Sequence, residues 1–445
     1  MSKVEAVIFD LDNTLVNTKA LEGFRKSTPG EAPSEDLLRE TKVYPKVRTI
    51  LREILSKGVK LAIVTNSTKR YAHAILEFHD IKRYFGSIIT YNDVSLEGKK
   101  PSPNGIEMAM KALNVGKKVL YIGDDEVDFN AAYAAHIKPI APAWASNNPI
   151  KQIPAAMLSS TYLIDELDDY DGIKLLAEFV ARNGAFSLPK KRYYFMPMLL
   201  NGDVGALKKE NIDAVCLGRY FSQGDPLTAL LHNKHALSQE IYKKDLHPNY
   251  VMPEYFVDLT LFYISKAPKF FYNTDDARFD IVTVIPSKKG KNPRLENMLN
   301  RVSKKYPDKA TRFISDLFYF EDDARSLKTL GGRDVREAEI KEKLKLKNKY
   351  KHEIQGSKVL IIDDVFTTGA TLRGAFSLIE HCIPDRIFGV CFAKTVNIKT
   401  VDKFCPECGR KMQCRTNRKT GKMFWGCTGY FEKTNQCRHT EDYSQ

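Results

Sequence analysis

The sequence contains no uninterrupted apolar stretch close to the ~20 residues that a membrane-spanning helix needs. Tryptophan is rare, with two in 445 residues, and five of the eight cysteines fall between Cys405 and Cys437. The N-terminus, MSKVEAVIFD, enters a strand-like pattern at once and has no apolar signal core. From these absences we expect a soluble, cytoplasmic protein with no membrane partner. The local cysteine cluster points to bound metal rather than to disulfides.

Positive charge is concentrated in the later part of the chain. Residues 1–185 hold 24 Lys and Arg against 24 Asp and Glu, residues 186–400 hold 36 against 26, and residues 401–445 hold 9 against 5. The net charge of +14 therefore arises entirely beyond residue 185. Segregated positive charge favours phosphate-bearing partners, with general solubility as the simpler alternative.

The first 150 residues alternate short apolar runs with amphipathic stretches, a pattern typical of a parallel α/β sheet. Segment Pro142–Tyr170 is predicted to be loop-like and to be followed by a helix at Ile173–Arg182. The predicted strands are Val4–Phe9, Val59–Thr65 and Val119–Gly123, and the predicted helices are Thr49–Ser56 and Pro103–Leu113.

A second α/β pattern follows Asn183-Gly184, which we take as a boundary. It contains a predicted helix at Val251–Lys266 and predicted strands at Phe279–Ile285 and Lys358–Ile362. In Lys341–Lys351 lysine occupies every second position, which predicts a strand with one cationic face; a solvated lysine-rich helix is the alternative. The predicted domains are 1–150, 186–400 and 401–445, with a linker and helix at 151–185.

Acidic, hydroxyl and lysine side chains follow the strands of the first domain. Asp10 and Asp12 end the first strand, where ligands of open α/β sheets bind. Two like charges so close favour a cation such as Mg²⁺ between them. The other candidates are Thr65 and Asn66 after the second strand, Lys100 after a turn, and Asp124, Asp125 and Asp128 after the third strand.

This ordered set, DxDxT, Thr-Asn, Lys-Pro and GDDxxD, resembles the haloacid dehalogenase (HAD) superfamily over residues 4–140. The resemblance implies a HAD-like Rossmannoid fold and a Mg²⁺-dependent phosphatase acting on a phosphorylated small molecule or nucleotide. Asp10 is then the nucleophile and Asp12 the general acid and base. Thr65 and Lys100 hold the phosphoryl group. Asn66, whose amide could hold phosphate oxygens, is predicted to belong to the same catalytic set. The implied Mg²⁺ ligands are drawn from Asp10, Asp12, Asp124, Asp125 and Asp128. Between the first two motifs, Val16–Tyr44 leaves room only for a small helical cap.

The strand Lys358–Ile362 enters the run DDVFTTGAT. Loop amides and threonine hydroxyls at a helix start form an anion cradle, and an acidic pair can accept hydrogen bonds from ribose hydroxyls. The run resembles the binding motif of type I phosphoribosyltransferases, most closely in its ComF-type form, over residues 250–395. The resemblance implies binding of phosphoribosyl diphosphate (PRPP), in a catalytic or a regulatory role. Asp363 and Asp364 would hold the ribose, Ser287 and Lys288 the pyrophosphate, and Thr367, Thr368, Gly369, Ala370 and Thr371 the 5′-phosphate.

The last segment has a C-x-x-C knuckle at Cys405 and Cys408, followed by Cys427 and Cys437. Two thiolate pairs can surround one Zn²⁺ tetrahedrally, and His439 is an alternative to Cys437. The module resembles the C-terminal zinc ribbons of bacterial type IA topoisomerases. Phe424, Trp425 and Tyr430 lie among Arg415, Arg418, Lys419 and Lys422. Aromatic residues among cations suit single-stranded DNA or RNA, or else the aromatics pack the hairpins.

Two functions remain open on the sequence. In the first, the protein is a bifunctional enzyme that removes a phosphate in one domain and binds or transfers a phosphoribosyl group in the other. In the second, it is a nucleic-acid-associated factor in DNA uptake, repair or defence, in which the ribbon binds strands, the HAD domain trims phosphates and PRPP is a signal. The sequence predicts neither the substrate nor the oligomeric state.

Overall fold

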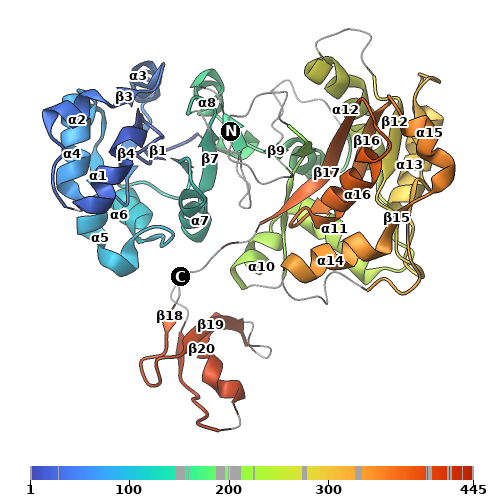
Figure 1. The fold of residues 1–445 in the computed structure, drawn as a ribbon. Helices are drawn as coiled ribbons and strands as arrows, with labels where there is room; N and C mark the ends of the chain where they lie inside the picture. Colours follow the sequence, from blue (N-terminus) through green and yellow to red (C-terminus); the bar gives the residue numbers. More distant parts are fainter. Residues whose placement is uncertain are drawn as a thin grey trace.

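The structure is a computed structural model in which three parts follow one another along the chain (Figure 1): an α/β part in blue to teal, a second in green to orange, and a small β part in red. Within the described part of the chain, no helix has both the length and the apolar character needed to cross a membrane. The structure describes residues 3–28, 30–145, 156–158, 160–186, 196–198, 200, 212–223, 226–272, 278–325, 333–396, 398, 403–417, 420, 423–432 and 434–442.

The first part is built on a six-stranded parallel sheet in the order β5-β4-β1-β6-β7-β8. In the central strand, Val7 and Phe9 pack on one face while Ala6 and Ile8 pack on the other. Both faces are buried, which explains why this strand is apolar throughout rather than alternating. The strands are β1 (Ala6–Phe9), β4 (Lys60–Val64), β5 (Ser87–Ile89), β6 (Val119–Ile122), β7 (Lys138–Pro142) and β8 (Ala156–Leu158).

Helices cover both faces of this sheet, as a parallel sheet requires. The helices α3 and α4 pack with the Val7 face, and α6 packs with the Ala6 face. Their bounds, with those of the other helices, are α3 (Val47–Ser56), α4 (Lys69–Phe78), η2 (Lys82–Tyr84), α5 (Tyr91–Gly98), α6 (Asn104–Leu113), α7 (Glu126–Ala134), α8 (Ser160–Glu166) and η3 (Tyr170–Gly172).

A small cap follows β1, in the stretch where the sequence leaves room for no larger one. It consists of two short helices and a two-stranded ribbon. Its elements are β2 (Val16–Asn17), η1 (Lys19–Leu21), α1 (Glu22–Ser27), α2 (Glu35–Arg39) and β3 (Lys42–Val43).

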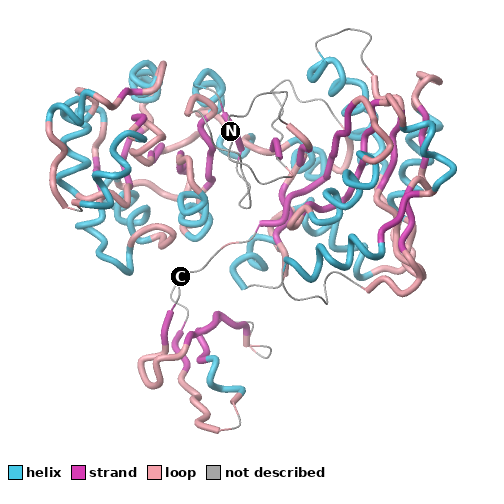
Figure 2. The backbone as a smooth tube through the Cα atoms, in the orientation of Figure 1, coloured by secondary structure: helices cyan, strands magenta, loops and turns pink. Residues whose placement is uncertain are grey.

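The second part has a seven-stranded sheet in the order β13-β12-β16-β17-β10-β9, with β11 also pairing with β17. Only β9 is antiparallel to its neighbour among these pairs. Figure 2 shows its strands in magenta with cyan helices on both sides. The strands are β9 (Met196–Met198), β10 (Ala214–Cys216), β11 (Arg219–Phe221), β12 (Ile281–Val284), β13 (Arg312–Ile314), β16 (Lys358–Phe366) and β17 (Arg386–Val396).

Alternation within β16 again divides the helices between two faces. Val359 and Ile361 pack in the cluster that includes α16, whereas Leu360 and Ile362 pack in the cluster that includes α12 and α13. The helices are α9 (Leu176–Asn183), α10 (Pro226–His232), α11 (Ala236–Leu246), α12 (Glu254–Tyr272), α13 (Arg294–Lys305), α14 (Arg333–Lys343), α15 (Lys351–Ile354) and α16 (Ala370–Glu380).

Two secondary-structure predictions are wrong. The segment predicted as loop-like, Pro142–Tyr170, contains β8 and α8, and β8 is the edge strand of the first sheet. The strand predicted for Lys341–Lys351 is confined to β15 (Leu344–Leu346), which pairs with β14 (Phe318–Phe320). Its N-terminal residues continue α14, because Ile340 and Leu344 are both buried in the cluster that includes α16. Residues four positions apart lie on one face of a helix, and the packing of these two thus outweighs the alternating lysine pattern. The turn η5 (Asn348–Tyr350) follows.

The segment predicted as a linker is divided between the two sheets. Strand β8 and helix α8 extend the first, whereas Leu176, Ala177 and Val180 of α9 pack in the core with α11 and α12. Between the two, Arg219 of β11 donates to the Tyr133 hydroxyl of α7 over 3.2 Å.

The C-terminal part is a four-stranded antiparallel sheet in the order β18-β19-β20-β21. Its elements are β18 (Lys403–Phe404), β19 (Lys411–Thr416), β20 (Met423–Cys427), η6 (Thr428–Phe431) and β21 (Thr440–Asp442).

Candidate functional site

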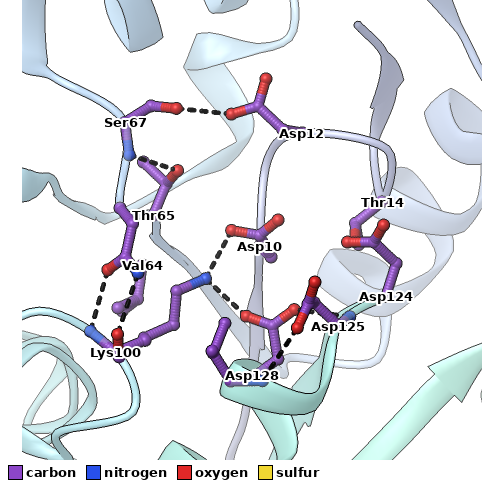
Figure 3. A network of polar contacts seen from close by, with 12 residues as sticks. Asp10, Asp12, Thr14, Val64, Thr65, Ser67, Lys100, Asp124, Asp125 and Asp128 are labelled. Atoms are coloured by element: carbon purple, nitrogen blue, oxygen red, sulfur yellow. Dashed lines mark hydrogen bonds and ion pairs between the residues drawn. The ribbon is translucent and has the colours of Figure 1, made fainter. Parts of the chain in front are cut away.

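The candidate residues of the first part meet at the carboxyl edge of its sheet (Figure 3). Strands β4, β1 and β6 are neighbours; Thr65 and Asp10 directly follow β4 and β1, and Asp124 follows β6 after Gly123. Lys100 comes from the segment between α5 and α6 and reaches into the same place. The order of the strands, rather than the order of the chain, therefore assembles the site.

A buried lysine joins two carboxylates at the centre of this site. Lys100 Nζ lies 2.6 Å from Asp10 Oδ1 and 2.5 Å from Asp128 Oδ1. Burial raises the pKa of Asp10, and the nearby Asp128 and Asp124 add to the rise while Lys100 opposes it. Burial disfavours the charged form of Lys100, but Asp10 and Asp128 outweigh it and raise its pKa. The ammonium group therefore stays charged inside the site.

Three carboxylates of this site can hold a divalent cation. Oxygen atoms of Asp10, Asp124 and Asp128 all lie within 4.8 Å of one another. Asp124 also accepts a hydrogen bond from Thr14 Oγ1 over 3.2 Å, and it is less buried than the other two. Hard oxygen donors with excess negative charge match the preference of Mg²⁺.

The other two carboxylates predicted as metal ligands have different partners. Asp125 caps α7: its side chain accepts from Val127 N over 3.1 Å, while Asp128 accepts from Asp125 N over 3.1 Å. Asp12 lies on the side of Ser67 (Figure 3), where Ser67 Oγ donates to Asp12 Oδ2 over 2.6 Å. The structure does not bring either carboxylate into the group of three.

Asp12 is surrounded by donors from the cap and from α4. Its Oδ1 accepts from Thr18 Oγ1 over 2.6 Å and from Tyr71 OH over 2.8 Å, and Arg25 Nη1 lies 2.8 Å away. Burial and the Asp12 charge together raise the pKa of Tyr71, so that its hydroxyl remains a donor. Asp12 is thus held close to Asp10 in the chain but outside the lysine-centred cluster.

A pocket of about 340 Å³ opens beside Asp12, between the cap and α4. Two cations, Arg25 and Lys99, lie on its wall, together with the aromatic rings of Phe24, Tyr71 and Tyr91. Glu31 also lines the pocket, so its wall carries charge of both signs.

Asn66 positions the backbone of Lys100. Its Nδ2 donates to Lys100 O over 3.0 Å and its Oδ1 accepts from Lys100 N over 2.8 Å. Because both ends of the amide are occupied, Asn66 fixes the backbone at Lys100. Tyr121 supports the same lysine: its hydroxyl accepts from Lys100 Nζ over 3.0 Å and donates to Val64 O over 2.8 Å.

Glycine is required at position 123. A Cβ atom built there lies 2.4 Å from the carboxylate of Asp128, far inside contact distance. The glycine of the GDD motif therefore allows the backbone to approach Asp128 closely.

The phosphoribosyl candidates lie at the carboxyl edge of the second sheet. Strands β12 and β16 are parallel neighbours; Ser287 and Lys288 follow the first, and the Thr367–Thr371 loop follows the second. The loop leads into α16, whose first amides lack intrahelical partners. Gly369 has a φ of +79°, and a Cβ there would lie 2.5 Å from the Phe366 ring. Lys394 Nζ donates to Thr367 O over 2.7 Å, which fixes the loop from β17.

The two acidic residues of β16 have opposite electrostatics. Asp364 Oδ2 lies 2.8 Å from Lys244 Nζ and accepts from Arg294 Nε over 2.8 Å. Burial opposes ionisation of Asp364, but Lys244 and Arg294 outweigh it and lower its pKa. Burial and the Asp364 charge raise the pKa of Asp363 to about 7. One carboxylate is therefore fully ionised and the other titrates near neutral pH.

The predicted pyrophosphate ligands have protein partners. Ser287 Oγ donates to Asn292 O over 2.7 Å, and Ser287 N donates to Glu296 Oε1 over 2.6 Å. Lys288 Nζ donates to Arg325 O and lies 4.9 Å from the centre of the Phe320 ring. Both residues follow β12 at the carboxyl edge of the sheet, and the contacts described for them are with these partners.

Four cysteines meet in the C-terminal part. The Sγ atoms of Cys405, Cys408, Cys427 and Cys437 all lie within 4.8 Å of one another, and all four are unpaired thiols. The Cys405–Cys437 Sγ distance is 3.6 Å and the Cys408–Cys427 distance is 3.4 Å. Four thiolates around one tetrahedral Zn²⁺ stand about 3.8 Å apart. His439 instead contacts Glu441, 3.1 Å away, and Glu407, 3.2 Å away.

Comparison with known proteins concerns the first part of the chain. A family model described as haloacid dehalogenase-like hydrolase matches residues 31–141. Phosphoglycolate phosphatase from Pseudomonas fluorescens Pf-5 is 34% identical over 134 residues, which is 30% of this chain and 47% of that protein. Pyrophosphatase PpaX from Oceanobacillus iheyensis is 30% identical over 129 residues, which is 28% of this chain and 57% of that protein.

Residues 31–141 of the first domain are thus similar to haloacid dehalogenase-like hydrolases, and we call this domain the HAD domain. The matched residues contain the HAD lysine Lys100 and the acidic residues Asp124 and Asp128, and they begin after Asp10 and Asp12. The chain spans about half the length of the curated relatives it matches. The structure of a HAD-superfamily hydrolase from Ehrlichia chaffeensis covers 32% of this chain and 89% of its own, with 22% identity and a TM-score of 0.27.

Several residues that contact the candidate side chains were not found from the sequence. In the HAD domain these are Tyr71, Tyr121 and Arg25. No sequence motif marks them, because their contacts depend on where the cap and the helices lie. In the second domain they are Lys244, Arg294 and Lys394. Lys244 lies 120 positions before its partner Asp364, in a region where the sequence matches no motif.

Proposed function

We propose that the HAD domain is a Mg²⁺-dependent phosphatase that works through an aspartyl-phosphate. The observation that carries this is the buried Lys100 ammonium between Asp10 and Asp128, with Asp12 beside them. Asp10 attacks the phosphorus atom, and the leaving oxygen takes a proton from Asp12. Asp12 then accepts a proton from the water that attacks the acyl phosphate, which releases phosphate and restores Asp10.

Lys100 offsets charge on the transferring group and also on the carboxylates around it. Asn66 and Tyr121 hold this lysine in place before substrate arrives. Bound at Asp10, Asp124 and Asp128, Mg²⁺ would neutralise the phosphoryl oxygens and lower the repulsion of the nucleophile.

The substrate we propose is a small phosphate compound with a second anionic group. Two similar proteins are named for phosphoglycolate and for pyrophosphate, and each of these molecules carries an anionic group near the phosphoryl group. In this chain Arg25 and Lys99 line the pocket beside Asp12 and supply two positive charges against the one carboxylate of Glu31.

The direct test is hydrolysis of phosphoglycolate, pyrophosphate and an aryl phosphate by the full chain. Activity should require Mg²⁺ and stop with EDTA, and Asp10→Asn should abolish turnover because an amide is not a nucleophile here. Asp36→Asn, on the exposed side of α2, is the matched control. Full activity in Asp10→Asn would refute the mechanism.

We further propose that the second domain binds phosphoribosyl compounds such as PRPP, as a transferase or as a sensor. Support comes from the loop after β16, where Gly369 makes the turn and Lys394 fixes Thr367, beside an ionised Asp364. Ribose 5-phosphate and PRPP should raise the melting temperature by mass action. The double variant Asp363→Ala and Asp364→Ala should lose this shift and keep phosphatase activity. No shift at millimolar ligand would contradict the proposal.

For the C-terminal part we propose a zinc ribbon, because the four thiols have the spacing of a tetrahedral site. Metal analysis should find one Zn²⁺ per chain. Cys427→Ser should lose it and unfold the ribbon, because a module with so small a core depends on its metal. Phosphatase activity should persist in this variant, since the HAD site belongs to another sheet.

A second candidate function is binding of single-stranded nucleic acid by the ribbon. Its support is that Phe404 and Tyr430 are about half exposed, 56% and 48%, whereas Trp425 packs on the cysteine cluster. The predicted cations Arg418, Lys419 and Lys422 lie outside the described residues. Binding should weaken steeply with salt, and Tyr430→Ala should cost about 1–3 kcal/mol if a base stacks on this ring. Salt-independent or unaltered binding would leave the ribbon as a structural module.

A further inference from the structure

Two cations contact the single carboxylate of Asp364 in the second domain. Lys244 and Arg294 both contact its Oδ2, and their side chains are only 14% and 22% exposed. The other acceptor near Arg294, Glu296, is engaged with Ser287. Both cations therefore converge on one carboxylate oxygen, and two converging cations can equally hold the oxygens of an anionic ligand.

The two cations reach this point from separate elements. Lys244 lies near the end of α11, and Arg294 is the first residue of α13, where the helix dipole also favours an anion. Ser287 and Lys288, which the family resemblance assigns to pyrophosphate, are turned to Asn292 O and Arg325 O. The cations that face the acidic pair are therefore not those that the motif indicates.

We propose that Lys244 and Arg294 bind the diphosphate group of the phosphoribosyl ligand. On binding they exchange Asp364 for phosphate oxygens, and Asp364 accepts hydrogen bonds from the ribose hydroxyls instead. The guanidinium fork of Arg294 suits two phosphate oxygens at once, while Lys244 adds a point charge. This inference rests on the proposed phosphoribosyl function of the domain.

The test compares two ligands that differ only in the diphosphate. Affinities of the full chain for PRPP and for ribose 5-phosphate are measured by titration calorimetry with Mg²⁺. Lys244→Met should weaken the affinity for PRPP at least tenfold and change the affinity for ribose 5-phosphate less than twofold. Lys244→Arg should restore most of the lost affinity for PRPP. Arg294→Lys should weaken PRPP selectively as well. Lys243→Met, the exposed neighbour that pairs with Glu240, is the matched control and should change neither.

An equal loss for both ligands would show that the cations only position Asp364, and no loss for either would show that they do not bind ligand; each result overturns the inference. Arg294→Lys keeps the ion pair and gives an independent result if Lys244→Met lowers the melting temperature. If the unmodified protein binds ribose 5-phosphate but not PRPP, the inference fails and the phosphoribosyl proposal stands. If it binds neither, both fail.

Discussion

The HAD site and the proposed phosphoribosyl site start from the same local pattern, carboxylates at the end of a buried parallel strand, but their electrostatics differ. In the HAD site one ammonium, Lys100, is shared by Asp10 and Asp128. In the phosphoribosyl site two cations gather on Asp364, while Asp363 is left with the amide of its neighbour. The first arrangement leaves excess negative charge and suits a metal ion. The second brings two cations to one carboxylate oxygen, which suits the exchange of that carboxylate for a polyanion.

The difference shows that an acidic pair in a sequence does not by itself define a site. What decides its chemistry is the number and origin of the cations that the fold brings to it. In the HAD site the cation belongs to a recognisable motif. In the phosphoribosyl site the cations come from α11 and α13, which the motif does not include.

Removal of the shared cation should give the largest effect. Lys100→Met should lower aryl-phosphate hydrolysis by about 10²–10³-fold, since a group that stabilises the transferring phosphoryl oxygens contributes on the order of 3–4 kcal/mol. Steady-state kinetics with saturating Mg²⁺ measure this. Lys111→Met, on the exposed face of α6, is the control. The two-site comparison breaks down if Lys100→Met also removes ribose 5-phosphate binding.

Two glycine substitutions sharpen the comparison. Gly123→Ala forces the Asp128 carboxylate to move, and Gly369→Ala combines a left-handed backbone with a clash against Phe366. Overpacking and backbone strain of this kind cost about 1–3 kcal/mol. Gly123→Ala should therefore lower hydrolysis about 10–100-fold without affecting ligand binding. Gly369→Ala should weaken ligand binding by a similar factor and leave hydrolysis unchanged.

Gly58→Ala separates strain from clash, because Gly58 has a φ of +72° and nothing within 4 Å of the added Cβ. Kinetics and thermal shift on all three variants provide the measurement. Loss of both hydrolysis and ligand binding in Gly123→Ala, or in Gly369→Ala, would contradict the separation of the sites.

The smallest effect concerns pH. With a pKa of about 7, Asp363 passes from mostly ionised at pH 8 to mostly protonated at pH 6. If it accepts hydrogen bonds from ribose as a carboxylate, affinity for ribose 5-phosphate should fall up to about tenfold over this range. The charged groups facing it are Asp364, Lys244 and Arg294; the pKa of Asp364 is lowered and that of Arg294 is raised, so neither of these two titrates in this range.

Asp363→Asn should flatten this profile to the part caused by the ligand phosphate itself, whose second pKa is about 6. Without ligand the sign is opposite. Because the folded pKa lies above the ordinary 3.8, the contribution of Asp363 to the free energy of unfolding is largest below that value and is lost as pH rises through about 7. An unchanged pH profile in Asp363→Asn would show that this carboxylate does not contact the ligand.

The strands that carry the HAD motifs were predictable because buried apolar runs mark them and the motif residues come directly after. The sequence also placed Asp10, Lys100, Asp124 and Asp128 in one site. It did not show that Asn66 serves the backbone of Lys100, because an amide beside a threonine looks the same whether it holds phosphate or a loop.

The features that the sequence did not predict depend on packing between residues far apart in the chain. The lysine alternation in Lys341–Lys351 resembles a strand, but burial of Ile340 and Leu344 against α16 decides the local structure. Lys244 and Arg294 carry no pattern of their own, and their role exists only once α11 and α13 are placed beside β16. Similarly, β8 is three residues long, and its place at the sheet edge depends on β7.

The most direct test of two independent phosphate sites is a reciprocal measurement on two variants of the full chain. Aryl-phosphate hydrolysis and the melting shift with ribose 5-phosphate are recorded side by side for Asp10→Asn and for the double variant Asp363→Ala, Asp364→Ala. We expect Asp10→Asn to lose hydrolysis and keep the full shift, and the double variant to lose the shift and keep hydrolysis within about twofold of the unmodified chain. Loss of both properties in either variant, with its fold intact, would contradict the account.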